Sequence, residues 1–87
     1  LNLYPSNAKN LDTTGYKKGD KGNGVLALKY LLMLAKKKSM HNINLDKNDI
    51  FGAGTQKAVN NILKNHGYSQ NGIAGKKFID LLGNELL

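Results

Sequence analysis

The chain has 87 residues, a length that excludes two independent hydrophobic cores and predicts one small domain. It contains no cysteine, which excludes a disulfide framework and a thiolate metal site. Thirteen basic residues, all of them lysine, and six acidic residues give a net charge of +7, which favours a polyanionic partner such as nucleic acid, anionic lipid or an anionic cell wall. The lack of arginine weakens the nucleic-acid interpretation, because bidentate contacts to bases and phosphates favour arginine.

Residues 1–15 are predicted to form a linker or an N-terminal docking segment ahead of a domain at residues 16–87. This stretch contains the only proline of the chain, Pro5, and shows no helical period. No apolar run approaches the ~20 residues that span a membrane, and no signal peptide is visible. Because the chain begins at Leu1 rather than at a methionine, we expect a fragment or a processed product, and any export signal would lie upstream.

The first helix is expected over residues 23–38, where apolar residues recur with the helical period on one face. A second apolar set, with Leu26, Tyr30 and Met33, lies roughly 100° away from Val25 around the helix axis, and Leu34 lies just beyond it. A helix that is apolar on two sides is buried on both or has a partner. We expect residues 1–15 to fold back on this second face through Leu3, Tyr4 and Leu11. A neighbouring domain and a second copy of the chain are the alternatives.

The second helix is expected over residues 54–66 and the third over residues 76–83, and Gly67 and Gly83 are expected to end them. Two Asn-Gly pairs lack flanking apolar alternation, so they are interpreted as loop turns rather than hairpins. The sequence therefore predicts an all-α fold, a compact three-helix bundle with a glycine-marked turn before each helix. The predicted core consists of Val25, Leu28, Leu32, Ala58, Val59, Ile62, Ile73, Phe78, Leu81 and Leu82.

A short repeat precedes the second and third helices. Residues 48–52, with the sequence NDIFG, return as residues 71–75, with the sequence NGIAG. The shared features are a tight turn, an Ile that is predicted to point inward, and a Gly that lets the backbone enter the helix. Residues 18–22, before the first helix, are a looser third instance. The domain is therefore predicted to consist of turn-plus-helix units.

Three motifs follow one another in order and at characteristic spacing. The first is Lys18-Gly19-Asp20-Lys21-Gly22, followed by Val25, Leu28 and Leu32. The second runs from Asn48 to Thr55 and is followed by Ala58, Val59 and Ile62. The third comprises Gly67, Tyr68, Asn71, Gly72, Gly75, Phe78 and Leu81. Over residues 16–83 these motifs resemble the peptidoglycan-binding domain-like family, the small three-helix modules of cell-wall hydrolases and phage endolysins. The chain departs from the family at Asn48-Asp49, usually Asp-Gly, and at Lys29, usually Gln.

The resemblance implies a non-catalytic module that binds peptidoglycan and targets an attached lytic or wall-remodelling enzyme to the bacterial cell wall. It implies an extracellular or cell-wall location, for a secreted or phage-released protein, with a covalently attached catalytic domain as partner. Two alternatives stay open: a basic helical domain that binds a polyanion such as nucleic acid or teichoic acid, and a protein-interaction domain. The lysines expected to add long-range attraction to an anionic wall are Lys17, Lys18, Lys21, Lys36, Lys37 and Lys38.

Peptidoglycan offers hydroxyls, acetamido groups, peptide amides and carboxylates, which suit amide side chains and an aromatic platform. Residues of these types lie in and around the turns before the second and third helices. The candidate ligand-binding residues are Tyr68, Gln56, Asn60, Asn71, Asn48, Asp49 and Phe51. Tyr68 and Gln56 are the leading candidates, because the Asn and Asp residues also suit turn formation and Phe51 also suits the core.

The sequence contains no pattern that indicates catalysis, a metal or a cofactor. His41 and His66 lack metal-ligand spacing and are predicted to face solvent. Residues 46–57 begin like a calcium loop, but Phe51 occupies its glycine position and Lys57 its glutamate position. No two carboxylates are placed to act as the pair of a glycosidase. We therefore expect no enzyme activity from this chain alone.

Overall fold

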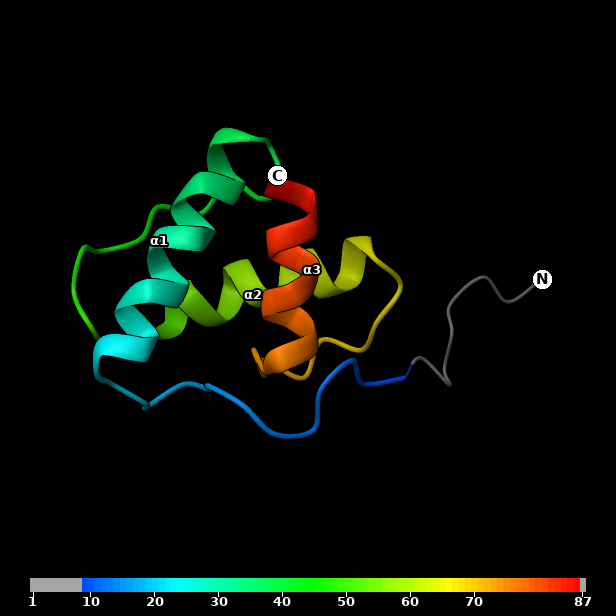
Figure 1. Cartoon of the computed structure of the whole chain (residues 1–87), viewed down its shortest axis with the longest axis horizontal. Helices are drawn as coiled ribbons and strands as arrows, with labels where there is room; N and C mark the ends of the chain where they lie inside the picture. Colours follow the sequence, from blue (N-terminus) through cyan, green and yellow to red (C-terminus); the bar gives the residue numbers. More distant parts are fainter. Residues whose placement is uncertain (1–8, 87) are drawn as a thin grey trace.

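The structure, a computed structural model, describes residues 9–86. It contains α1 at Asn23–Lys37, α2 at Ala53–Asn65 and α3 at Lys76–Leu86, and no strand within the described range. Figure 1 shows α1 and α3 side by side, with α2 crossing behind them. The predicted all-α three-helix bundle is confirmed.

The first two helices end with the same backbone motif. After α1, the Met40 N–H donates to the Ala35 carbonyl at 3.0 Å, and Ser39 adopts a φ of 63°. After α2, the Tyr68 N–H donates to the Leu63 carbonyl at 2.9 Å, and Gly67 adopts a φ of 82°. These are Schellman-type ends, in which a left-handed residue reverses the chain. The predicted end of the second helix at Gly67 is therefore confirmed.

The prediction that Gly83 ends the third helix was wrong, because α3 continues to Leu86. A glycine inside a helix costs about 1 kcal/mol relative to alanine. The last turn of α3 makes tertiary contacts that offset this cost. Leu86 packs against the core, and the Glu85 carboxylate lies 2.9 Å from Nε2 of His66.

The core lies between the three helices and the two turns before α2 and α3. Its buried residues are Val25, Leu28, Leu32, Ala35, Phe51, Ala58, Val59, Ile62, Leu63, Ala74, Phe78 and Leu82. Two predicted members, Ile73 and Leu81, are only partly buried. The expectation that Phe51 also suits the core is confirmed, since it is fully buried.

The two copies of the repeat form the same turn. The Asn48 side-chain oxygen accepts the Ile50 N–H at 3.1 Å, and the Asn71 side-chain oxygen accepts the Ile73 N–H at 3.2 Å. The prediction of an inward Ile was wrong, because Ile50 is 50% exposed. The next residue of each copy, Phe51 or Ala74, is buried instead. The chain is extended at this point, so neighbouring side chains alternate between solvent and core.

The segment from residue 9 to residue 22 joins the two turns, as Figure 1 shows along the lower edge of the molecule. Tyr16 and Ala74 exchange two backbone hydrogen bonds, of 3.0 and 2.8 Å. Further along, the Phe51 N–H donates to the Asp20 carbonyl at 2.8 Å, and the Gly22 N–H donates to the Asp49 carbonyl at 2.9 Å. The part of the N-terminal segment that the structure describes therefore belongs to the folded unit.

The basic side chains of His41 and Lys29 are buried, and the burial of His41 contradicts a prediction. His41 was predicted to face solvent, but it is 7% exposed. Its Nδ1 accepts the Ile43 N–H at 3.0 Å, so Nε2 carries the proton that it donates to the Leu32 carbonyl at 2.7 Å. Lys29 is 3% exposed, and its ammonium donates to the Asn48 side chain at 2.7 Å and to the Ile50 carbonyl at 2.9 Å. Both side chains tie α1 to the loop that follows it.

Candidate functional site

The candidate ligand residues lie in three separate places. Asn48 and Asp49 are in the turn before α2, and the Asn48 amide is engaged by Lys29 and Ile50 within the fold. Tyr68 borders a hollow that Leu11 and other residues around α3 also line. Phe51 is buried in the core, and the remaining candidates, Gln56, Asn60 and Asn71, lie on α2 and in the turn before α3.

Gln56 and Asn71 lie near each other. The Gln56 side chain packs over Gly72, where a β-carbon would be 3.1 Å from the Gln56 amide nitrogen. The Asn71 amide nitrogen donates to the Asp12 carbonyl at 2.7 Å, so this side chain is used to fasten the N-terminal segment. Asn60 lies one turn beyond Gln56 on the same side of α2, and its Oδ1 is buried without a hydrogen-bond partner among the described residues. The hollow that Tyr68 lines does not include Gln56 or Asn60.

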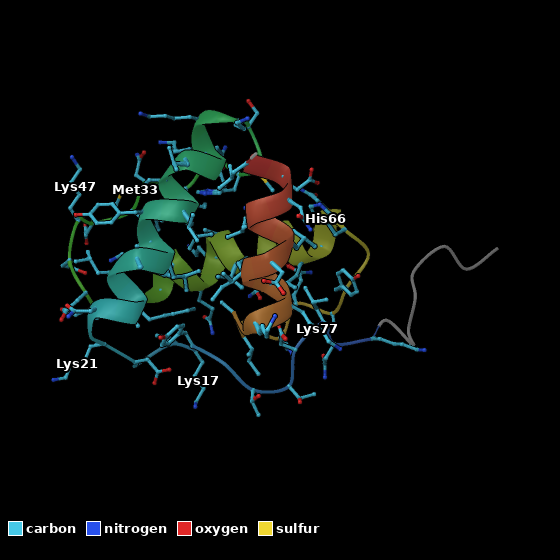
Figure 2. All side chains as sticks on the ribbon, viewed as in Figure 1. Lys17, Lys21, Met33, Lys47, His66 and Lys77 are labelled. Carbon is cyan, nitrogen blue, oxygen red and sulfur yellow. The ribbon has the colours of Figure 1, made fainter. Side chains whose placement is uncertain are left out.

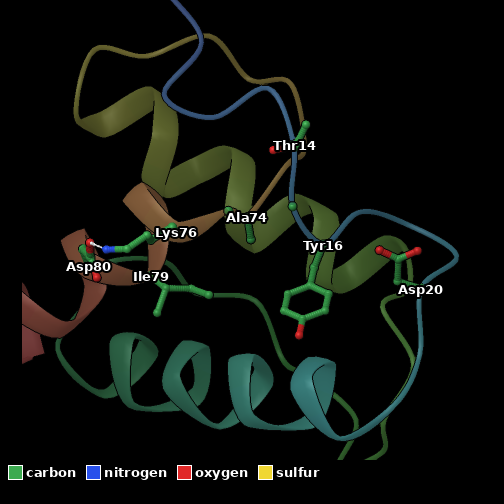
Figure 3. A pocket seen from close by; sticks show the side chains of 9 residues that line it. Thr14, Tyr16, Asp20, Ala74, Lys76, Ile79 and Asp80 are labelled. Carbon is green, nitrogen blue, oxygen red and sulfur yellow. Dashed lines mark hydrogen bonds and ion pairs between the residues drawn. The ribbon is translucent and has the colours of Figure 1, made fainter.

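An open groove of about 590 Å³ lies on the turn before α3. Figure 3 shows its lining residues, which come from residues 14–20, the turn before α3 and the first turns of α3. The groove exists because the Tyr16–Ala74 backbone pairing fixes the N-terminal segment alongside the turn. It is lined by Thr14, Gly15, Tyr16, Asp20, Ala74, Gly75, Lys76, Ile79 and Asp80.

The groove combines apolar and charged groups. The Tyr16 ring and Ile79 supply apolar surface, and the Thr14 hydroxyl can donate and accept hydrogen bonds. Lys76 and Asp80 form an ion pair of 2.9 Å, and its hydrogen bond raises the pKa of the Lys76 ammonium. The Asp20 carboxylate accepts the Lys17 backbone N–H at 3.1 Å. Such a set of groups suits non-covalent binding of a ligand that carries hydroxyls, amides and charges.

Glycine is required where the N-terminal segment passes α3. A β-carbon on Gly75 would overlap the Thr14 carbonyl oxygen and the Asp12 side chain. A β-carbon on Gly15 would overlap the backbone of Gly75, and Gly15 itself has a φ of 152°. These two closely approaching glycines both line the groove.

A smaller hollow of about 150 Å³ lies on the equivalent turn before α2. Lys29, Asn48 and Thr55 are among its lining residues. Within residues 9–86 no group of three or more His, Asp or Glu side chains could hold a metal ion. None of the helices described is both long enough and apolar enough to cross a bilayer.

The sequence did not indicate the residues of the larger groove. Thr14 fell within the predicted linker or docking segment, and Tyr16, Asp20 and Lys76 were not among the candidates. The signals that pointed to this region were the repeat at residues 71–75, which marks the turn on which the groove lies, and the motifs that contain Asp20 and Gly75. Comparison of the chain with protein-family models, curated proteins and solved structures finds no match.

Proposed function

We propose that this chain is a non-catalytic module that binds peptidoglycan and targets a covalently attached lytic or wall-remodelling enzyme to the bacterial cell wall. The groove on the turn before α3 is the observation on which this proposal depends. It overlaps the third motif of the family resemblance, at Gly75. The proposed location is the cell exterior or the cell wall.

The groups of the groove complement the groups of peptidoglycan. An aromatic ring such as that of Tyr16 packs against the apolar face of a sugar, and the Thr14 hydroxyl pairs with sugar hydroxyls or acetamido groups. Lys76 offers an ammonium to a stem-peptide carboxylate, and Asp20 offers an acceptor to peptide amides. The net charge of +7 adds long-range attraction to anionic wall polymers without specifying the ligand.

The test is retention on purified peptidoglycan, with and without teichoic acid, over a series of salt concentrations. Sugar and peptide contacts in the groove should survive salt, whereas polyanion binding falls steeply through counterion release. We expect retention on wall stripped of teichoic acid, with soluble DNA as a poor competitor. Retention only on walls that carry teichoic acid, or full displacement by DNA, would instead indicate a polyanion-binding domain.

Groove variants locate the site. Thr14→Val removes the hydroxyl while keeping the shape of the side chain, and Lys76→Gln removes the ammonium. Each should weaken binding to stripped peptidoglycan by roughly tenfold, the loss of one good polar contact. Lys64→Gln, an exposed lysine on α2, is the charge-matched control and should bind as the parent does. If instead Tyr68→Ala and Gln56→Ala abolish binding and the groove variants do not, the site lies at those two residues.

A further inference from the structure

The outer face of α1, defined here as Leu26, Tyr30, Met33, Leu34 and Lys37, is apolar but half exposed. Tyr30 is 49% and Leu34 48% exposed, and the two lie one helical turn apart. We expected the N-terminal segment to cover this face. Leu3 and Tyr4 lie outside the described residues, and Leu11 packs elsewhere, in the hollow that Tyr68 and Leu81 line.

The stretch of chain that carries this face contains basic residues and no acidic one, and the nearest acids, Asp20, Asp46 and Asp49, flank it. Residues 21–45, which include the whole of α1 and the start of the next loop, contain five lysines and no Asp or Glu. Figure 2 shows Lys21, Met33 and Lys47 on the α1 side of the molecule, away from α3. An exposed apolar face flanked by ammonium groups is complementary to a partner with an apolar interior and an anionic surface.

A hollow of about 370 Å³ lies beside the outer face, between α1 and the loop at residues 43–45. Met33, Ile43 and Leu45 give it apolar walls, and Lys36 and Lys37 also line it. An ammonium beside an apolar hollow suits a ligand whose anionic group adjoins a hydrocarbon chain. Anionic phospholipids have this arrangement, with the phosphate next to the acyl chains.

We propose that the outer face of α1 docks onto an anionic lipid surface. Tyr30 and Leu34 enter the interface between headgroups and acyl chains, and Lys37 contacts the lipid phosphates together with Lys36, whose ammonium also donates to the Asn44 side chain. This interaction is separate from the groove, so it goes beyond the proposed wall binding and does not depend on it.

The charges favour lipid over a second copy of the chain and over an acidic protein partner. A second copy of the chain would bring the same lysines and the same net charge of +7 to a symmetric interface, where they repel. An acidic protein partner is recognised best by arginine, which binds carboxylates in a bidentate manner, and the chain has none. Lysine, a point charge on a flexible stem, suits the diffuse potential of a membrane surface.

The first experiment uses the lack of tryptophan in the chain. In a Tyr30→Trp variant the single indole reports the polarity of its surroundings. On addition of phosphatidylglycerol vesicles its emission should shift to shorter wavelength, and phosphatidylcholine vesicles should cause no shift. A Gln70→Trp variant, at an exposed position in the loop before α3, should show no shift with either lipid. A Tyr30→Trp emission that stays unchanged with phosphatidylglycerol would overturn the proposal.

The second experiment measures cosedimentation with the same vesicles. The double variants Tyr30→Ser/Leu34→Ser and Lys36→Gln/Lys37→Gln should each lose affinity by roughly tenfold or more. The control Lys57→Gln/Lys64→Gln removes the same charge from exposed positions on α2 and should stay within about twofold of the parent. Circular dichroism checks that each variant keeps its helices.

Two outcomes would assign the face differently. If the α2 control loses as much affinity as the α1 lysine variant, the attraction is a diffuse charge effect and the outer face is not a docking site. If the parent elutes as a dimer that Tyr30→Ser/Leu34→Ser dissociates, and no vesicles are bound, the occupant is a second copy. The same double variant should bind stripped peptidoglycan like the parent, so the lipid and wall proposals fail independently.

Discussion

The carboxylate of Asp12 accepts the backbone N–H of Phe78 at 2.9 Å, across 66 residues of sequence. It also accepts the N–H groups of Gly75 and Lys77, each at 3.2 Å, so one side chain satisfies three donors at the start of α3. A helix usually takes its N-terminal cap from the residue just before it. Here the cap comes from the N-terminal segment, and it fastens that segment to α3 on one side of the groove.

Replacing Asp12 by Ala should therefore destabilise the whole domain. Loss of a helix N-terminal cap costs about 1–2 kcal/mol, and the stabilising interaction of the carboxylate with the helix dipole is lost as well. Urea unfolding followed by circular dichroism measures the effect. Asp46→Ala removes an exposed acid from the loop before α2 and should stay within about 0.5 kcal/mol of the parent. Equal midpoints for the two variants would contradict the cap.

Truncation of Phe78 should bring the domain close to unfolding. The side chain is fully buried, and Phe→Ala changes in cores cost about 3–5 kcal/mol. A small domain holds about 5–10 kcal/mol in total. Thermal unfolding of Phe78→Ala should show a large drop in Tm, whereas Leu34→Ala, at a half-exposed position, should show little change. An unchanged Tm for Phe78→Ala would show that the core is packed differently.

The His66–Glu85 pair should make stability depend on pH near neutrality. The hydrogen bond to Glu85, and then that to the Ile62 carbonyl, raise the pKa of His66 above its ordinary value of 6.5. Because the folded-state pKa is the higher one, the stabilisation is fully present below pH 6.5 and is lost as pH rises through the folded pKa. Its size should be at most about 1 kcal/mol, since the pair is partly exposed.

The effect is measured as the free energy of unfolding at pH values from about 5 to about 9, a range that includes the ordinary pKa of histidine. The parent should lose stability over this range, and Glu85→Gln should flatten the profile. His41→Gln is not a suitable control, because that ring is part of the buried network around Leu32. A Glu85→Gln profile with the slope of the parent would contradict the role of the pair.

Ser39 and Gly67 occupy equivalent helix ends, which gives a paired test. Ser39 adopts a φ of 63°, a conformation that costs a residue with a side chain roughly 1 kcal/mol and glycine much less. Ser39→Gly should therefore stabilise the domain, and Gly67→Ser should destabilise it by a similar amount. Chemical denaturation measures both changes. The same sign for both variants would contradict the shared geometry of the two ends.

The helices could be predicted from the sequence because their signals are local. Apolar residues recur every three or four positions in each helix, and Gly67 lies where the chain must reverse. The repeat also predicted two like turns, since each Asn bonds to a backbone N–H only two residues away. The family resemblance rests on these same local patterns, and so does the choice of Asn48 and Asn71 as candidates.

The capping of α3, the burial of His41, the end of α3 and the groove depend on contacts between segments far apart in the chain, and no local pattern encodes these contacts. Nothing near Asp12 shows that it caps α3, and nothing near His41 shows that its ring closes on the Leu32 carbonyl. Gly83 resembles a helix end until the contacts of Leu86 with the core are taken into account. The groove forms only where Tyr16 pairs with Ala74, so its residues come from segments far apart in the chain. The sequence by itself determined the helices and turns, through short-range periodicity and turn chemistry. Only the packed tertiary structure decided where the groove lies and which residues line it, because burial and hydrogen bonding between distant segments are properties of the whole fold.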